Sequence, residues 1–299
     1  MAESLSAPQS DWAPGPAWLF CPADRPDRYG KALAAADVVI VDLEDAVAPA
    51  AKESAREALR GLAADGMLDV ERTVVRVNGA GPDSAGDHAL DVALTKEIGV
   101  RRVMLAKTEH ASHVAALPHD VVVLLETPAG IERAGEIAAA DNTVAVMWGA
   151  DDLVAGLGGT SSRYADGRYR DVARYARSRA LVAAKASGRL ALDAVHMDIR
   201  DVDGLAAECE DAVAVGFDAT VAIHPSQVAV IRSAYTPAAE RLDWARRLLE
   251  HVGDDRSVTT FEGRMVDGPI YKQAERVLRL AEATAGSAQT TGGQGWRRT

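Results

Sequence analysis

Eight short apolar runs, each bounded by polar or turn residues, constrain the fold of this chain more than any other feature of its sequence. They are Trp18–Cys21, Val38–Asp42, Thr73–Val77, Arg102–Leu105, Val121–Leu125, Val144–Trp148, Leu190–Val195 and Ala219–Ile223. The runs are nearly continuous and lack the strict alternation of a half-exposed strand, so both faces of each predicted strand are expected to be buried. Such strands are typical of a parallel sheet that is covered by helices.

Helical stretches separate most of these strands. The sequence predicts helices at Asp27–Ala36, Lys52–Ala63, Ile131–Ala140, Asp171–Ser187 and Asp203–Val215. Gly188 is expected to end the fourth of them. Eight strands that alternate with helices predict a (β/α)₈ TIM barrel over residues 17–235. A doubly wound open sheet is the rival, but it usually has fewer strands, and no GxGxxG motif follows the first strand.

Beyond the last strand, three further helices are predicted at Ser226–Ala234, Ala238–His251 and Gly268–Glu282. The first of them closes the barrel. Residues 236–284 are predicted to form a C-terminal helical extension that covers the barrel mouth or reaches a neighbouring subunit. Residues 1–16 and 285–299 are predicted to be disordered, because polar and small residues or proline dominate them.

Charge and cysteine content limit the classes of function. Asp and Glu outnumber Lys and Arg by 44 to 33, so general binding to nucleic acid or to an anionic membrane is not expected. The two cysteines form no CxxC pair, and the N-terminus lacks the basic and apolar regions of a secretory signal. No apolar run approaches the roughly 20 residues that a membrane helix needs. We therefore expect a cytoplasmic protein that acts on small molecules.

Carboxylates follow several predicted strands at their C-terminal ends, where a TIM barrel places its active site. The fifth strand ends in Glu126, and the sixth leads through a small Gly-Ala turn, which leaves space, to Asp151 and Asp152. Carboxylates at one barrel mouth repel each other unless a cation holds them, and Mg²⁺ commonly takes one or two carboxylates. Glu126 and Asp152 are therefore the predicted metal ligands. The alternative for both is that they cap the helices that follow.

Further charged residues lie at the ends of the second, third and fourth strands. Arg76 lies within the apolar run TVVRV, where a buried guanidinium needs anionic partners. It is predicted to stabilise negative charge on a substrate oxygen, to pair with Glu44 at the rim, or to do both. Asp42, Glu44 and Asp45 are either partners of Arg76 or solvated loop charges. Lys107 is either a substrate contact or part of a rim ion pair.

Six segments carry a resemblance to a known family. FCPADRPDRYGKALAAADVVIVDLEDAV, VVRVN, LLETPAG, MWGADDL, AIHPSQ and FEGRMVDGPI occur in the order and spacing of the citrate lyase β-subunit-like (CitE-like) family, within the HpcH/HpaI aldolase superfamily. The chain resembles in particular the stand-alone, mycobacterial-type members, and the resemblance extends from Trp18 to Leu280. It implies a TIM barrel that binds one Mg²⁺ ion, with Mn²⁺ as a substitute, and that forms a homotrimer.

The resemblance also implies roles for individual residues of the barrel. Glu126 and Asp152 match the metal ligands of the family. Arg76 matches its active-site arginine, which contacts substrate and acts in catalysis. Glu44 matches the acidic residue of its second strand, for which a catalytic supporting role and a structural role remain open.

Substrate and subunit contacts are implied in the same way. The backbone N–H groups of Gly149, Ala150 and Asp151 would hold the carboxylate of a 2-oxo acid. Asp267, in MVDGP, would act as a catalytic acid in the site of a neighbouring subunit, although it could equally be the N-cap of the helix that follows. Arg25 and Lys31 would contact the phosphates of CoA, unless they belong to an ordinary solvated helix face.

The resulting hypothesis is a Mg²⁺-dependent carbon–carbon lyase. Its substrates would be 3-hydroxyacyl-CoA thioesters such as malyl-CoA or citramalyl-CoA, cleaved to acetyl-CoA and glyoxylate or pyruvate, or formed in the reverse direction, and thioester hydrolysis could follow. One alternative is cleavage of a citryl group on an acyl carrier protein to give oxaloacetate. The others are a CoA-free 2-oxo acid aldolase and a barrel that serves as a non-catalytic scaffold.

Overall fold

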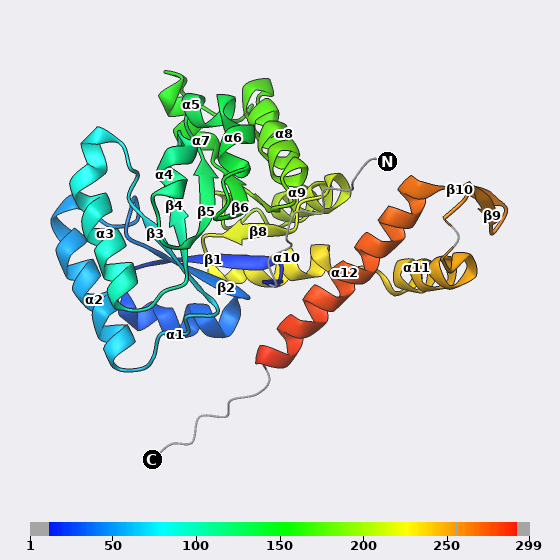
Figure 1. Ribbon diagram of the computed structural model, residues 1–299, viewed down its shortest axis with the longest axis horizontal. Coiled ribbons are helices and arrows are strands. Elements are labelled where there is room, and N and C mark those ends of the chain that lie inside the picture. The colour runs from blue at the N-terminus through cyan, green and yellow to red at the C-terminus, as the bar shows by residue number, and fades with distance from the viewer. Residues whose placement is uncertain (1–11, 255, 292–299) are drawn as a thin grey trace, which may run out of the picture.

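The computed structural model describes residues 12–254 and 256–291 and shows a closed barrel of eight parallel strands surrounded by helices (Figure 1). In order around the barrel, the strands are β1 (Ala17–Pro22), β2 (Val38–Asp42), β3 (Thr73–Val77), β4 (Arg102–Leu105), β5 (Asp120–Leu125), β6 (Thr143–Trp148), β7 (Leu190–Asp193) and β8 (Ala219–Ala222). β8 pairs with β1, with Trp18 opposite Val221, and this pairing closes the sheet. The predicted TIM barrel is confirmed, and the open sheet is excluded.

Side chains alternate along each strand between two buried surfaces. Val38 and Ile40 of β2 belong to the apolar cluster that fills the barrel interior. Val39 and Val41 belong to the cluster between the strands and the surrounding helices. Every residue of β2 and β3 is buried, as the nearly continuous apolar runs predict.

Helices follow the strands and cover the outside of the barrel. They are α1 (Pro26–Ala35), α2 (Lys52–Ala64), α3 (Ala85–Glu97), α4 (Ala111–Ala115), α5 (Pro128–Glu132), α6 (Ala134–Ala138), α7 (Ala150–Gly156), α8 (Asp171–Ala186), α9 (Val202–Val215) and α10 (Pro225–Tyr235), with 3₁₀ turns at Pro49–Ala51 and Pro82–Ser84. Gly188 follows α8 with φ 65°, as expected of a helix stop. The single helix predicted at Ile131–Ala140 is instead two short helices, because the backbone leaves the helical conformation at Arg133 (φ −95°, ψ 13°).

A C-terminal extension begins after α10 and projects from the barrel (Figure 1). It consists of α11 (Ala239–Val252), a hairpin of β9 (Thr259–Phe261) and β10 (Arg264–Val266), and α12 (Gly268–Thr291). α11, the hairpin and the first part of α12 share a small apolar core. Further along α12, Leu280 joins the main core and Arg276 pairs with Asp218 of the barrel. The sequence predicted both helices but not the hairpin, whose turn contains Glu262 (φ 48°) and Gly263 (φ 75°).

The two segments that were predicted to be disordered, residues 1–16 and 285–299, lie mostly outside the described residues. Within the first, Trp12 packs against Trp18 with ring centroids 5.3 Å apart, and the Arg102 guanidinium lies over its ring. Within the second, α12 continues to Thr291. None of the helices in the described part of the chain is long and apolar enough to cross a membrane.

Candidate active site

A cavity of about 170 Å³ lies at the C-terminal end of the barrel strands. Its lining includes Arg76 of β3, Glu126 after β5, and Asp152 in α7. The Gly149–Asp151 turn also lines it. The two predicted metal ligands and the predicted active-site arginine therefore meet at one cavity.

Glu126 is the most deeply buried carboxylate of this cavity, with 3% of the residue exposed. Its Oε1 accepts a hydrogen bond from the backbone N–H of Lys107 at 2.9 Å. Burial, and then the charge of Asp152, raise the pKa of Glu126 to about 8, and Arg76 opposes this shift only in part. A cation between the two carboxylates would remove their repulsion and favour the charged form.

Gly149 provides the room that the Glu126 carboxylate occupies. A Cβ atom at position 149 would lie 2.8 Å from Cβ of Glu126 and 2.9 Å from its Oε2. The φ of Gly149 is −125°, which any residue can adopt, so the close approach of Glu126 is what requires glycine. The sequence predicted open space at this turn beside Asp152, and the structure shows that Glu126 uses it.

Neither predicted metal ligand caps a helix. Thr127, not Glu126, is the N-cap of α5, and its hydroxyl oxygen accepts the N–H of Gly130 at 3.1 Å. Gly149 is the N-cap residue of α7, and Asp152 lies inside the first turn of this helix. The capping alternatives are therefore wrong for both carboxylates.

Asp151 and Asp152 lie in the first turn of α7 but have different partners. Oδ1 of Asp151 accepts the hydroxyl of Ser162 at 2.6 Å. The Asp152 side chain is 44% exposed, and its Oδ1 lies 3.9 Å from Nζ of Lys107. Asp152 thus remains accessible to an ion, whereas Asp151 is engaged by the loop that follows α7.

The donor set fits a hard divalent cation. Glu126 and Asp152 present carboxylate oxygens to one cavity, and their repulsion contributes to the raised pKa of Glu126. Among residues 12–254 and 256–291, no three His, Cys, Asp or Glu side chains are arranged to hold a metal ion. The protein would therefore supply two ligands, which suits Mg²⁺, because this ion usually keeps its other positions for water and substrate.

Arg76 is held in place by two carboxylates. Its Nε and Nη2 donate to the two oxygens of Asp42 at 2.7 and 2.5 Å, and its Nη1 lies 3.1 Å from Oε2 of Glu44. Asp42 is fully buried and also accepts the N–H groups of Glu44 and Ala46. Burial alone would lower the pKa of Arg76, but Asp42 raises it above its ordinary value. Of the two readings for Asp42 and Glu44, the pairing with Arg76 is therefore confirmed.

Lys107 pairs with the acidic rim. Its Nζ contacts Oε1 of Glu44 and lies 3.0 Å from Oδ2 of Asp45. Burial lowers the pKa of Lys107, but its hydrogen bonds to Glu44 and Asp45 outweigh burial and raise the pKa. Burial also raises the pKa of Glu44, against the charges of Arg76 and Lys107. Of its two predicted roles, the rim ion pair of Lys107 is present.

The Gly149–Asp151 turn offers fewer donors than the resemblance implied. The N–H of Gly149 donates to the carbonyl of Leu125 at 3.1 Å, as part of the junction between β5 and β6. Ala150 and Asp151 begin α7, where the N–H groups of the first turn have no acceptor within the helix. These two groups are the ones placed to receive a substrate carboxylate.

Arg25 is the N-cap residue of α1, which follows β1 and so begins at the same end of the barrel as the cavity, whereas Lys31 lies in the middle of this helix. Arg25 is exposed and donates from Nε and Nη2 to the two oxygens of Asp27, each at 2.9 Å. Lys31 is also exposed. The position of Arg25 is compatible with the predicted contact to CoA phosphates, although Asp27 offsets its charge, and the contact of Lys31 stays a prediction.

Asp267 lies apart from the cavity. It connects β10 to α12 and does not line the cavity, and its carbonyl accepts the N–H groups of Ile270 and Tyr271. Figure 1 places the junction of β10 and α12 on the part of the extension that projects from the barrel. Within one chain, therefore, Asp267 is not brought together with Arg76 and Glu126.

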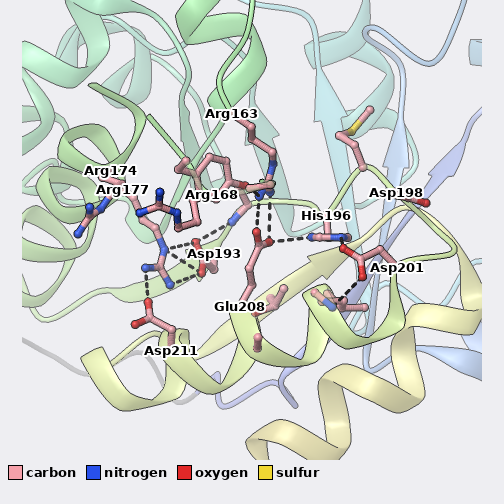
Figure 2. Close-up of a pocket in the computed structure, with 18 of the residues that line it drawn as sticks. Arg163, Arg168, Arg174, Arg177, Asp193, His196, Asp198, Asp201, Glu208 and Asp211 are labelled. Atoms are coloured by element: carbon pink, nitrogen blue, oxygen red, sulfur yellow. Dashed lines mark hydrogen bonds and ion pairs between the residues drawn. The ribbon is translucent and has the colours of Figure 1, made fainter. Parts of the chain in front are cut away.

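A second cavity, of about 930 Å³, lies beside the first, between α8, the end of β7 and α9 (Figure 2). The two cavities share Arg163, Tyr169, Ala194 and Met197 in their linings. Figure 2 shows that charged side chains of the larger cavity pair with one another, such as Arg163 with Glu208. This ion pair connects Arg163, which lines both cavities, to α9.

Asp193 is the residue of this region that sequence reasoning missed. It ends β7, accepts the indole N–H of Trp148 at 2.7 Å, and pairs with Arg177 at 2.7 Å. It thereby joins the ends of β6 and β7 to α8. The rule that pointed to Glu126, a carboxylate at a strand end, applies here too, but the predicted strand ran to Val195 and so placed Asp193 inside it.

Comparison with known proteins agrees with this geometry. Residues 17–225 match the family described as HpcH/HpaI aldolase/citrate lyase. The chain belongs to this family. A citrate lyase subunit beta-like protein of Mycobacterium tuberculosis, a relative in the family, is 58% identical over 275 residues, which cover 91% of this chain and 98% of that protein.

A solved structure and a more distant enzyme extend the HpcH/HpaI comparison. CitE from Mycobacterium tuberculosis, in complex with magnesium, acetoacetate and coenzyme A, matches with a TM-score of 0.83 and 57% identity, over 90% of this chain and 99% of that chain. Mitochondrial citramalyl-CoA lyase of Mus musculus is 30% identical over 275 residues, which cover 82% of this chain and 79% of that protein. The chain is thus a CitE-like member of a family that includes a carbon–carbon lyase.

Proposed function

We propose that this protein is a Mg²⁺-dependent carbon–carbon lyase that cleaves 3-hydroxyacyl-CoA thioesters, such as citramalyl-CoA or malyl-CoA, into acetyl-CoA and a 2-oxo acid. The observation that carries the proposal is the single cavity lined by Arg76, Glu126 and Asp152. The CitE relative that holds magnesium, acetoacetate and coenzyme A supports the same classes of ligand. The citramalyl-CoA lyase relative supports the choice of substrate.

Glu126 and Asp152 would hold the Mg²⁺ ion. Bound there, the ion supplies Lewis-acid polarisation of the substrate oxygen beside it. Ala150 and Asp151 would orient the substrate carboxylate through the N–H groups at the start of α7, where the helix end is partly positive. These contacts would hold the oxo-acid half of the substrate beside Glu126 and the first turn of α7, which carries Asp152.

Arg76 would stabilise the negative charge that develops on the reacting oxygen. A guanidinium has five N–H donors. Two of those on Arg76 donate to Asp42 and its Nη1 forms an ion pair with Glu44, so N–H groups remain for substrate. Because both carboxylates fix the guanidinium before substrate arrives, little reorganisation is needed during the reaction.

Cleavage moves one proton off the substrate and one onto a product. A base takes the proton of the 3-hydroxyl group, the oxygen of that group becomes the carbonyl of the 2-oxo acid, and the carbon–carbon bond breaks. The electron pair of that bond moves onto the acetyl carbon as an enolate, which then takes up a proton to give acetyl-CoA. Asp267 of a neighbouring subunit in a homotrimer is the proposed donor, in keeping with its place outside its own chain's cavity.

The test is direct assay of the purified protein. We expect citramalyl-CoA or malyl-CoA to be cleaved with Mg²⁺ present, with pyruvate or glyoxylate and acetyl-CoA identified by mass. EDTA should abolish the reaction, and Mg²⁺ or Mn²⁺ should restore it. Glu126→Gln should reduce kcat by at least about hundredfold. Glu57→Gln, which changes an exposed carboxylate on α2, should not alter the rate.

A panel of substrates separates the rival functions. Cleavage of a citryl group only on an acyl carrier protein would favour the citrate lyase role. Turnover of free 4-hydroxy-2-oxo acids without turnover of any thioester would favour the CoA-free aldolase. Truncated pantetheine thioesters test the proposed contacts of Arg25 and Lys31, since these should raise KM if the two residues bind the CoA phosphates. Failure of every substrate would favour a scaffold.

A further inference from the structure

Lys107 is connected to both predicted metal ligands. Its φ of 48° lies in the left-handed region, which a lysine adopts only at an energetic cost. In this conformation its N–H donates to Oε1 of Glu126 at 2.9 Å, and its Nζ lies 3.9 Å from Oδ1 of Asp152. One residue therefore reaches the buried ligand through its backbone and the exposed ligand through its side chain.

The Lys107 ammonium lies among three carboxylates at the rim, and Arg76 also pairs with one of them, Glu44. It contacts Glu44 and lies 3.0 Å from Asp45, in addition to its approach to Asp152. Arg76 and Arg163 line the cavity, but Arg76 is held by a bidentate bond to the fully buried Asp42 and Arg163 pairs with Glu208. The Lys107 side chain is 38% exposed, so it has room to move at the rim. Its charge is therefore a counter-charge for Glu44 and Asp45 at the rim and for Asp152, which lines the cavity.

We propose that Lys107 is a positioning residue that serves as a built-in counter-cation, which orders the carboxylates of the metal site and weakens their affinity for Mg²⁺. The inference rests on the proposed function, because it deepens the account of the same site. A divalent ion between Glu126 and Asp152 competes with the ammonium for Asp152. Lys107 then keeps its bonds to Glu44 and Asp45, while its backbone N–H still fixes Glu126.

Removal of the Lys107 charge should change the stability of the metal-free protein and its affinity for Mg²⁺ in opposite directions. Loss of the Lys107 charge leaves carboxylates unpaired, so the metal-free protein becomes less stable. The same loss makes the electrostatic potential at the ligands more negative, so Mg²⁺ binds more tightly. A lysine that only held the fold together would, when removed, weaken ion binding along with stability.

The experiment compares Mg²⁺ binding by calorimetry and thermal unfolding of the metal-free protein in four forms of the full chain. Lys107→Met keeps the apolar stem and removes the charge, and Lys107→Arg keeps the charge. Lys96→Met is the matched control, because Lys96 is exposed in the last turn of α3, at the opposite end of the barrel. We expect Lys107→Met to lower the Kd for Mg²⁺ on the order of tenfold and to unfold at a lower temperature without metal. Lys107→Arg and Lys96→Met should keep the wild-type Kd.

The inference is overturned if the Kd of Lys107→Met for Mg²⁺ is unchanged or higher. A raised KM for the oxo acid with an unchanged Kd for Mg²⁺ would also overturn it and would make Lys107 a substrate contact. If Mg²⁺ fails to bind the wild-type protein, the proposed function itself fails. Because the wild-type titration alone gives that result, the two failures are distinguishable.

Discussion

Glu126 and Gly149 depend on each other at the scale of single residues. Gly149→Ala would place a methyl group 2.8 Å from Cβ and 2.9 Å from Oε2 of Glu126. We expect this variant to displace the carboxylate, to weaken Mg²⁺ binding at least about tenfold, and to cost about 1–3 kcal/mol of stability. Calorimetric titration with Mg²⁺ and urea unfolding measure the two effects.

Gly135→Ala is the control for this substitution. A Cβ atom at Gly135, in α6, meets nothing within 4 Å. This variant should leave Mg²⁺ binding unchanged and should stabilise the protein by up to about 1 kcal/mol, because alanine favours the helix. Normal Mg²⁺ affinity in Gly149→Ala would show that the Glu126 carboxylate can move without loss.

The sequence predicted which residues gather at the site better than it predicted their partners. A carboxylate directly after an apolar run identified Glu126, because strand ends share one edge of the barrel. The pairing of Arg76 with Asp42 depends on the register of β2 against β3, which places these two residues opposite each other. The left-handed backbone of Lys107 left no signal in its residue type. Contacts set by register or by an unusual backbone were therefore beyond the sequence.

At the scale of elements, the connection from β7 to α9 forms part of the wall that the two cavities share, through Ala194 and Met197. His196 holds it in place, with Nδ1 2.9 Å from Glu208 and Nε2 3.3 Å from Asp201. Its carbonyl accepts a hydrogen bond from Gln227 of α10 at 2.8 Å. The hydrogen bond to Glu208 raises the pKa of His196 above 6.5, against burial and the charge of Arg163.

The raised pKa of His196 predicts how its contribution to stability varies with pH. A group whose pKa is higher in the folded state contributes fully below its unfolded pKa and loses that contribution as pH rises through the folded value. We expect His196→Gln to lower the free energy of unfolding by about 1–2 kcal/mol at pH 6 and by less at pH 9. Urea unfolding at both pH values tests this, and equal losses would contradict it.

Most strands were predicted to within a residue or two, because an unbroken apolar run can only be buried on both faces. The helix expected at Ile131–Ala140 was not, because Arg133 interrupts it while the apolar pattern continues. The β9–β10 hairpin was missed among polar residues, although Glu262-Gly263 between two short runs is a recognisable two-residue turn. The polar composition of this segment argued against strands, although its turn residues indicate a hairpin.

At the scale of the whole molecule, Asp218 connects the C-terminal extension to the barrel. Its carboxylate pairs with Arg276 of α12 and Lys185 of α8, and accepts the N–H of Ala191 at 2.8 Å. Asp218→Asn leaves both cations beside a neutral amide, so we expect a loss of about 3 kcal/mol. Limited proteolysis should cut the extension of this variant faster than that of the wild type.

Asp243→Asn serves as the control for Asp218→Asn. Asp243 forms an exposed pair with Arg247 on α11, and removal of such a pair should cost less than about 0.5 kcal/mol. Proteolysis of its extension should stay at the wild-type rate. An extension that resists cleavage in Asp218→Asn would mean that apolar contacts alone hold α12.

The proposed homotrimer predicts that two inactive variants complement each other. Glu126→Gln removes a metal ligand, and Asp267→Asn removes the proposed proton donor, which would lie on a different subunit of the same site. After joint refolding in equal amounts, about a quarter of the sites of a cyclic oligomer would receive both intact residues. We expect about a quarter of wild-type activity in the mixture and almost none in either variant alone. No recovery would place both residues on one chain.

The bond between Arg76 and Asp42 also restricts how this chain can diverge over time. Asp42 accepts hydrogen bonds from Arg76 and from two backbone N–H groups. A neutral side chain at position 76 would leave the buried Asp42 without a cation, and one at position 42 would leave Arg76 with Glu44 as its remaining anionic partner. A substitution at only one of these two positions is therefore unfavourable. We expect relatives that lack an arginine at the position of Arg76 to lack the aspartate at the position of Asp42 as well. Such relatives should also catalyse a different reaction, because Arg76 is the residue proposed to stabilise the negative charge on the substrate.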